Sequence, residues 1–101
     1  MAFFFMKLIP PRATFPHDAS EEELAAMSRH ADYVKQLIEK DIVVAAGPVM
    51  EGEGAWGMAI VNVDTEANAN AIGDADPIVQ SAIGFRWDVL PMGSLLYKHA
   101  T

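Results

Sequence analysis

Two side chains that can exchange a proton near neutral pH lie far apart in this sequence, His30 and Asp76. Histidine donates or accepts a proton at physiological pH, and a carboxylate partner would hold its tautomer and balance the imidazolium charge. Asp76 precedes Pro77, which is typical of a helix cap, and a carboxylate has enough lone pairs to cap a helix and orient His30 together. We therefore expect a minimal acid–base pair at the rim of an apolar pocket. The alternative is a half-packed helix histidine beside an ordinary cap.

Four further residues are candidates for substrate binding. Tyr33 lies three residues after His30 and would line the pocket or donate a hydrogen bond, with packing as the alternative. Gly47 and Pro48 are expected to shape a turn at the end of a strand, with backbone N–H groups facing the pocket. Arg12, in a loop, would bind an anionic substrate unless it is simply solvated.

Several other chemistries are excluded. The chain has no cysteine, so disulfides, thiolate nucleophiles and Cys-based zinc sites are absent. No serine has the Gly-x-Ser-x-Gly context of a nucleophile elbow, and no Gly-rich phosphate loop is present. No cofactor is implied. The remaining metal candidates lack the close spacing that places two ligands on one helix face, so no metal site is expected; they are His17, Asp18, His30 and His99.

The bulk composition indicates one small acidic domain. A chain of 101 residues supports a single core, so residues 1–101 are read as one domain, with its core at about 3–92 and a tail at 93–101. The net charge of −7 argues against a nucleic-acid partner. The apolar start, residues 1–6, is too short to span a bilayer and lacks a signal-peptide pattern. With the absence of cysteine, this favours a cytoplasmic protein without a membrane partner.

The elements that must position these side chains follow from hydrophobic periodicity. Residues 3–9 are apolar on both alternating sets, as in a strand buried on both faces. Ser20 and Glu23 have the spacing of a capping box and open the main helix. His30 falls at the edge of that helix's apolar stripe. The stripe, expected to be its buried face, consists of Leu24, Met27, Ala31, Val34 and Ile38.

The second half of the chain predicts a hairpin, a helix and a last strand. Residues 42–46 and 56–63 are the hairpin strands, with a Gly-rich turn at 51–54 before the second. The first strand is expected to end at Gly47 and Pro48. An Ala-rich segment over 66–73 predicts a helix, and Pro77 begins a short helical segment. Residues 85–90 are the last strand, and the tail could add an edge strand.

This order predicts a ferredoxin-like βαββαβ α+β sandwich, an antiparallel sheet with two helices on one face. The other sheet face would then expose more apolar area than monomers usually do, and 51% of the residues are hydrophobic. Trp56, Trp87 and the aromatic residues 3–5 are read as core or interface residues. A homodimer through the sheet face, or a higher oligomer, is therefore expected.

Four short motifs, in this order and spacing, resemble the YciI-like (YCII-related) family over roughly residues 3–92. They are residues 30–33 (His-Ala-Asp-Tyr), 46–48 (Ala-Gly-Pro), 75–77 (Ala-Asp-Pro) and 89–91 (Val-Leu-Pro). The resemblance implies a dimeric α/β-barrel of ferredoxin-like fold with a His–Asp pair, carried here by His30 and Asp76. The chain departs from the family pattern at Ile78, where an aromatic residue is common, and at Ala82, where a glycine is usual. Both departures are expected to reshape the pocket floor.

Two functions remain open at this point. In the first, the chain is a cofactor-free enzyme in which His30 moves a proton on an unknown small molecule and Asp76 orients it. Elimination, isomerisation and hydrolysis are all compatible with this pair, as in a dehydrochlorinase-like lyase or a hydrolase. The resemblance adds that one branch of the family eliminates chloride from chlorinated hydroxyhydroquinones. In the second, the chain is a non-catalytic dimeric module that binds a small ligand or a partner protein.

Overall fold

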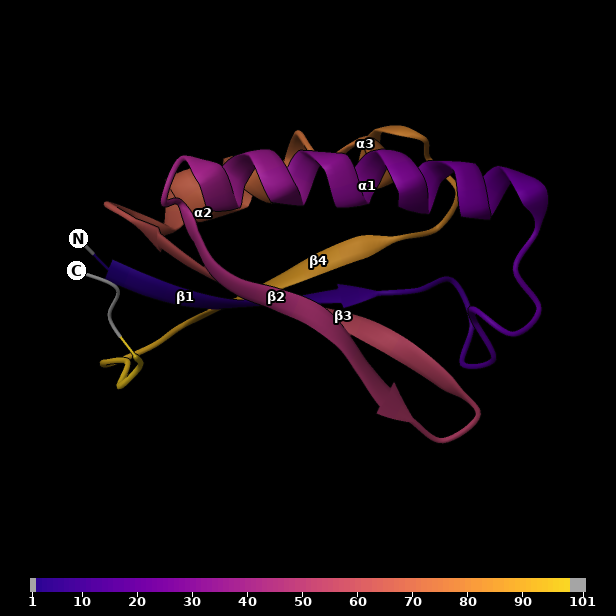
Figure 1. The fold of residues 1–101 in the computed structure, drawn as a ribbon, viewed down its shortest axis with the longest axis horizontal. Coiled ribbons are helices and arrows are strands. Elements are labelled where there is room, and N and C mark those ends of the chain that lie inside the picture. Colours follow the sequence, from indigo (N-terminus) through magenta and orange to yellow (C-terminus); the bar gives the residue numbers. More distant parts are fainter. Residues whose placement is uncertain (1, 99–101) are drawn as a thin grey trace.

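The computed structural model describes residues 2–98 as four strands and three helices (Figure 1). In chain order these are β1 (Ala2–Ile9), α1 (Glu21–Glu39), β2 (Val43–Glu51), β3 (Gly54–Val63), α2 (Glu66–Asp74), α3 (Pro77–Gln80) and β4 (Arg86–Pro91). All neighbouring strands pair antiparallel, in the order β2-β3-β1-β4. The predicted α+β class is confirmed, and the arrangement is consistent with a ferredoxin-like fold. It has three helices, because the short segment after Asp76 is a helix of its own.

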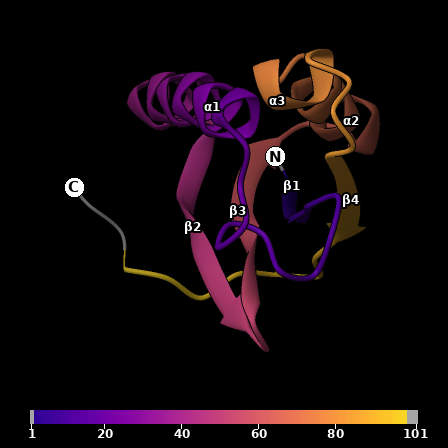
Figure 2. The ribbon, with the colours of Figure 1, turned by 90° about the vertical axis from the view of Figure 1, so that its right-hand side faces the viewer.

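The three helices cover one face of the sheet in two groups. Helix α1 lies above β2, whereas α2 and α3 lie above β4 (Figure 2). The core beneath them forms two clusters of buried side chains. One is centred on Phe4, Met6 and Val61, and the other on Leu8, Ile78 and Phe85.

Helix α1 begins with the predicted capping box. The Ser20 hydroxyl accepts a hydrogen bond from the backbone N–H of Glu23, and the Glu23 carboxylate accepts one from the N–H of Ser20. The buried side chains of the helix are Glu23 and Ala26. The predicted buried stripe is buried only in part. Met27 and Val34 pack against the two core clusters. Leu24 is 55% exposed and Ile38 43% exposed. That stripe faces a cleft, described below.

Strand β2 corrects the expectation that Gly47 and Pro48 end a strand. The strand continues through both residues to Glu51, and Pro48 pairs with Gly57 of β3. The physical reason is that β2 is an edge strand with a neighbour on one side only, so a proline without an N–H is tolerated when that position faces outward. The hairpin turn lies between Glu51 and Gly54, as the Gly-rich segment 51–54 predicts.

Two side-chain caps define the helices of the second half. Thr65 caps α2 by accepting from the N–H of Asn68, and Asp76 caps α3 by accepting from the N–H of Ile78. Pro77 occupies the first turn of α3, where its missing N–H has no intrahelical partner to lose. Both predicted helix starts are confirmed.

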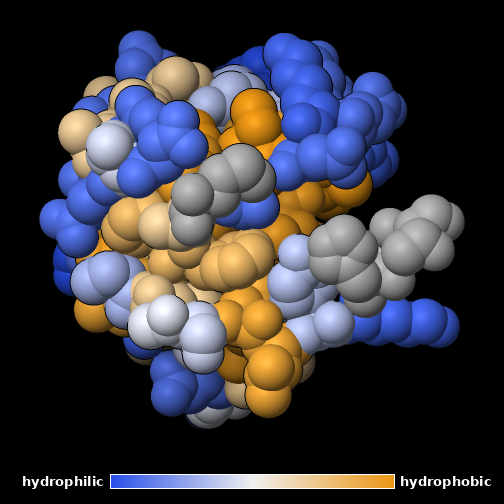
Figure 3. Space-filling view, turned by 90° about the vertical axis from the view of Figure 1, so that its left-hand side faces the viewer, coloured by the Kyte–Doolittle hydropathy of each residue, from blue (hydrophilic) through white to orange (hydrophobic). Residues whose placement is uncertain are grey.

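The sheet face away from the helices carries the alternate residues of each strand. On β1 these are Phe3, Phe5 and Lys7, since Phe4, Met6 and Leu8 point to the core. In the described tail, residues 92–98 form no strand; the N–H of Met92 donates to the carbonyl of Phe3, and the Tyr97 ring packs edge-on against Phe3 at 5.6 Å. The end of the molecule where β1 begins shows hydrophobic residues across its middle, between hydrophilic margins (Figure 3). His99 and the end of the predicted tail lie outside the described residues.

No helix within residues 2–98 combines the length and the apolar character needed to cross a membrane.

Candidate active site

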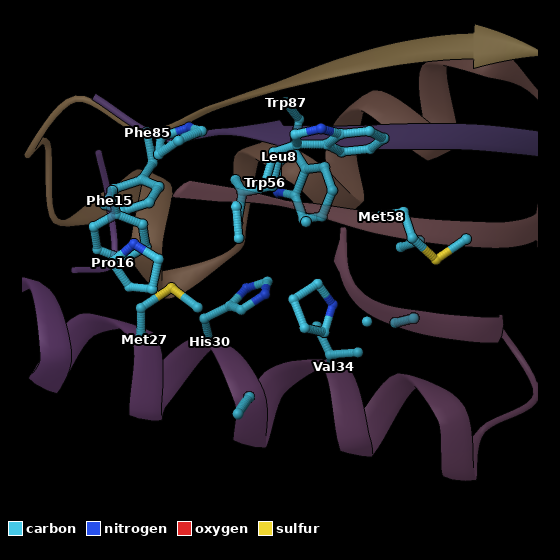
Figure 4. Close-up of a pocket in the computed structure, with 18 of the residues that line it drawn as sticks. Leu8, Phe15, Pro16, Met27, His30, Val34, Trp56, Met58, Phe85 and Trp87 are labelled. Atoms are coloured by element: carbon cyan, nitrogen blue, oxygen red, sulfur yellow. The ribbon is translucent and has the colours of Figure 1, made fainter. Parts of the chain in front are cut away.

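A cleft of about 530 Å³ opens between helix α1 and the sheet (Figure 4). Such a volume lies within the range of small-molecule sites, about 300–1,000 Å³. The five residues of the predicted α1 stripe all line it, which explains why an apolar stripe stays partly exposed; they are Leu24, Met27, Ala31, Val34 and Ile38. The opposite wall comes from residues 46–48 of β2 and 55–59 of β3. The cleft is therefore an almost wholly apolar compartment.

His30 enters this cleft from α1 and is held from behind by Asp76. The imidazole Nδ1 lies 2.7 Å from Asp76 Oδ2, and the side chains are 13% and 1% exposed respectively. The other carboxylate oxygen, Oδ1, accepts the backbone N–H of Ile78 at 3.0 Å. Asp76 thus caps α3 and contacts His30 at the same time, as its two oxygens allow. The predicted proximity of the two side chains is present.

The Asp76 carboxylate determines which nitrogen of the His30 ring carries the proton. An ionised carboxylate only accepts hydrogen bonds, so Nδ1 carries the proton and Nε2 carries the free lone pair when the ring is neutral. Within residues 2–98, Nε2 has no hydrogen-bond partner. The Trp87 ring lies beside the imidazole, with ring centroids 5.9 Å apart. The arrangement can therefore accept a proton from a molecule in the cleft.

Tyr33 is not on the cleft wall. Its hydroxyl donates a hydrogen bond of 2.7 Å to the backbone carbonyl of Ile72, near the end of α2. Burial, and to a smaller extent the charge of Asp76, raises the pKa of the Tyr33 hydroxyl above its usual value. The hydroxyl therefore stays protonated and remains a donor at physiological pH.

Arg12 also lies outside the cleft, and it is fully paired with acidic groups. Its guanidinium contacts both carboxylate oxygens of Glu23 at 2.7 Å and the Asp18 carboxylate at 2.9 Å. These bonds raise the Arg12 pKa and hold the pKa of Glu23 down to about 2. Arg12 therefore links the loop after β1 to the start of α1. Its charge is already paired with two carboxylates and does not bind an anionic substrate in this arrangement.

Gly47 and Pro48 do line the cleft, but as part of a continuous edge strand. The sequence reasoning did not place several other residues in the cleft, among them Phe15, Phe85 and Lys35. Phe15 and Phe85 pack edge-on with centroids 5.0 Å apart, and Lys35 is the cationic side chain of the lining. Lys35 directly follows Val34 of the apolar stripe, and this adjacency could have predicted that Lys35 borders the cleft. Among residues 2–98, no group of three or more His, Cys, Asp or Glu side chains is arranged to hold a metal ion.

The two departures from the family pattern do not line the cleft, which corrects the expectation that they reshape its floor. Ile78 is fully buried in the core cluster with Leu8 and Phe85, so it supports the wall from behind. Ala82 adopts φ = 56°, in the left-handed region that favours glycine. A family glycine at this position has a physical reason, and the alanine here is strained.

Comparison with known proteins agrees with this fold. The family profile of the YCII-related domain matches residues 3–93. Among solved structures, the chain is similar to 5-chloro-2-hydroxyhydroquinone dehydrochlorinase (TftG) from Burkholderia phenoliruptrix AC1100, solved in complex with 2,5-dihydroxybenzoquinone. The match has a TM-score of 0.52 at 13% identity and covers 96% of this chain and 95% of the other. No curated protein matches the sequence.

Proposed function

The chain belongs to the YCII-related family, and from this premise we propose that it is a cofactor-free enzyme that performs acid–base chemistry on a small organic molecule. The cleft would hold the substrate, His30 would move the proton, and Asp76 would orient His30. One observation carries the proposal: His30, the only imidazole among residues 2–98 that lines the apolar cleft, is paired with a buried carboxylate at 2.7 Å.

The proposed step is a proton transfer to Nε2. The free lone pair of Nε2 accepts a proton from a C–H or O–H group of the substrate, and the electrons of that bond remain on the substrate. The resulting imidazolium keeps its Nδ1–H bond to Asp76, whose charge balances it. The apolar walls place few polar groups near the pair, which strengthens this electrostatic pairing. Return of the proton to another atom gives isomerisation, and loss of a leaving group gives elimination.

The structural neighbour supports the elimination branch. That protein is a dehydrochlorinase, and such an elimination requires a base that removes a proton. Lys35 at the cleft would favour negative charge that develops on the substrate. We therefore place elimination first, followed by isomerisation and hydrolysis.

The alternative is a non-catalytic module that binds a small ligand. The same apolar lining favours it, because it contains few polar groups that would hold a reacting molecule in one orientation. A module would bind ligands in the cleft without converting them.

We also propose that the protein is a homodimer through the open sheet face. Phe3 and Phe5 lie on that face, and Leu90 of the adjoining strand is 54% exposed. Phe5→Glu would place a charge in this apolar surface. Light scattering after gel filtration should give twice the chain mass for the native protein and the chain mass for the variant. A native monomer contradicts the dimer.

The experiment for the enzymatic proposal is a thermal-shift screen of a metabolite panel, followed by a bound crystal structure and a test for conversion. The proposal expects a ligand in the cleft whose transferable proton lies within about 2.6–3.2 Å, heavy atom to heavy atom, of His30 Nε2. It also expects conversion of that ligand to product. Ligands that occupy the cleft unchanged after prolonged incubation favour the module, and ligands that bind elsewhere contradict both functions.

A further inference from the structure

Two hydrogen bonds join helix α1 to the segment that carries Asp76. The first is the His30–Asp76 pair, and the second runs from the Tyr33 hydroxyl to the Ile72 carbonyl, each 2.7 Å long. Within the described chain, no other hydrogen bond between side chains or backbone groups links α1 to residues 72–76. The pair is thus accompanied by a second, uncharged bridge.

Both hydrogen bonds join helix α1 to the junction between α2 and α3. His30 and Tyr33 are three residues apart on α1, so their side chains leave neighbouring points of one helix surface. Ile72 lies near the end of α2, and Asp76 follows the α2 C-cap and begins α3. A shift of α2 relative to α1 would therefore change both distances together.

The Tyr33 hydroxyl is suited to fix this spacing. The side chain is partly buried, and its phenol stays protonated for the reasons given above. A tyrosine ring has only two side-chain torsions, so a hydroxyl anchored at its tip sets a nearly constant distance between the two backbones. Its hydrogen is committed to Ile72, and the side chain is absent from the cleft wall, so a substrate contact does not account for it.

We infer that Tyr33 is a positioning residue for the acid–base pair: its bond to the Ile72 carbonyl sets the distance between α1 and the α2–α3 junction, and so keeps His30 Nδ1 on Asp76. The catalytic meaning of this inference rests on the function proposed above. Its geometric content does not, because the state of the His30 ring can be measured without a substrate.

The test compares Tyr33→Phe with Tyr97→Phe, which removes the hydroxyl of the chain's other tyrosine, on the opposite sheet face. Long-range ¹H–¹⁵N correlation at a pH where the imidazole is neutral reports which ring nitrogen carries the proton. The native protein and Tyr97→Phe should show His30 protonated at Nδ1 alone. Tyr33→Phe should move the two ring-nitrogen shifts towards the average of both tautomers. An unchanged native pattern in a folded Tyr33→Phe protein overturns the inference.

A second sample covers the case in which Tyr33→Phe does not fold. Fluorotyrosine incorporated into the Tyr97→Phe variant replaces Tyr33 alone, and the fluorinated ring has nearly the same shape as tyrosine. Raising the pH then ionises the phenol and removes the donated proton. The His30 tautomer should lose its Nδ1 preference as Tyr33 ionises; a preference that persists through that transition also overturns the inference.

Activity provides the readout that separates this inference from the proposed function. On a confirmed substrate, Tyr33→Phe should lower kcat by up to roughly 10²-fold with little change in KM, because misplacement of the base affects the reaction more than binding. If His30→Gln keeps full turnover while Tyr33→Phe still alters the tautomer, the enzymatic proposal fails and the positioning role stands. If His30→Gln is inactive while Tyr33→Phe keeps both native kcat and native tautomer, the positioning role fails alone.

Discussion

Substitution of Asp76 separates its two structural contributions, the cap of α3 and the bond to His30. Asp76→Ala removes both. Loss of an N-cap acceptor costs about 0.5–2 kcal/mol, and loss of a hydrogen bond to a charged group costs about 1.5–3 kcal/mol. The two terms together predict a loss of about 2–5 kcal/mol in the free energy of unfolding, a large share of the ~5–15 kcal/mol typical of a domain.

Asp76→Asn should behave differently, because asparagine caps helices as well as aspartate does. Its amide oxygen would keep the N–H of Ile78, and its NH₂ group would then face Nδ1 as a donor. The bond to His30 becomes a neutral one, which predicts a loss of only about 1 kcal/mol. The same change reverses the tautomer, so that Nε2 carries the proton and the base is lost from the cleft.

Urea unfolding at pH 7 measures these free energies, with unchanged m-values as the check that both variants unfold from a similar native state. Asp74→Ala is the matched control, because Asp74 is exposed two residues earlier, and it should lie within about 0.5 kcal/mol of the native protein. An Asp76→Ala variant as stable as this control would contradict both stabilising roles assigned to the Asp76 carboxylate. An Asp76→Asn variant that loses as much stability as Asp76→Ala would contradict the expectation that asparagine keeps the cap.

Three further substitutions test the Arg12–Glu23 pair, the backbone at Ala82 and the packing at Gly73. The Arg12 pair holds the pKa of Glu23 near 2, against 4.5 for a free glutamate; this stabilisation is therefore present above pH 4.5 and disappears as the pH falls towards 2. Glu23→Gln should lose that portion of the acid dependence in urea midpoints measured from pH 7 to pH 2, and an identical pH profile would contradict the assignment. Ala82→Gly should raise the free energy of unfolding by about 0.5–1 kcal/mol, since relief of the left-handed strain exceeds the added chain entropy; a lower melting temperature would count against it. Gly73→Ala should cost about 1–3 kcal/mol by overpacking, because the new Cβ would lie 2.9 Å from Trp87 Cδ1, and a neutral result in urea unfolding would show that the Trp87 ring moves freely.

The His30–Asp76 pair could be predicted because both residues also take part in local sequence patterns. Asp76 before Pro77 is a helix-cap signal that depends on neighbouring residues only, and the capping box at Ser20 fixes the phase of α1 and hence the direction of His30. The pairing of these two residues came from the family motifs and the expected helix–sheet arrangement. Local structure and family pattern therefore located the pair.

The rest depends on partners that no local pattern shows. Whether Pro48 can remain inside a strand depends on β2 being at the sheet edge, a property of the whole topology. The role of Arg12 depends on its ion pair with Glu23. The sequence identifies Glu23 only as part of the capping box, so it does not predict this ion pair. The sequence pattern of the apolar stripe of α1 is the same whether the stripe faces a core or a cleft. Periodicity shows which helix face is apolar, but it does not show which residues pack against that face.

The turnover number of His30→Gln on a substrate found by the screen tests most directly whether His30 transfers the proton. General acid–base assistance contributes about 10²–10⁴-fold, so kcat should fall by that factor in a variant whose ¹H–¹⁵N spectrum shows a folded protein. Full turnover by this variant would contradict the assignment of proton transfer to His30.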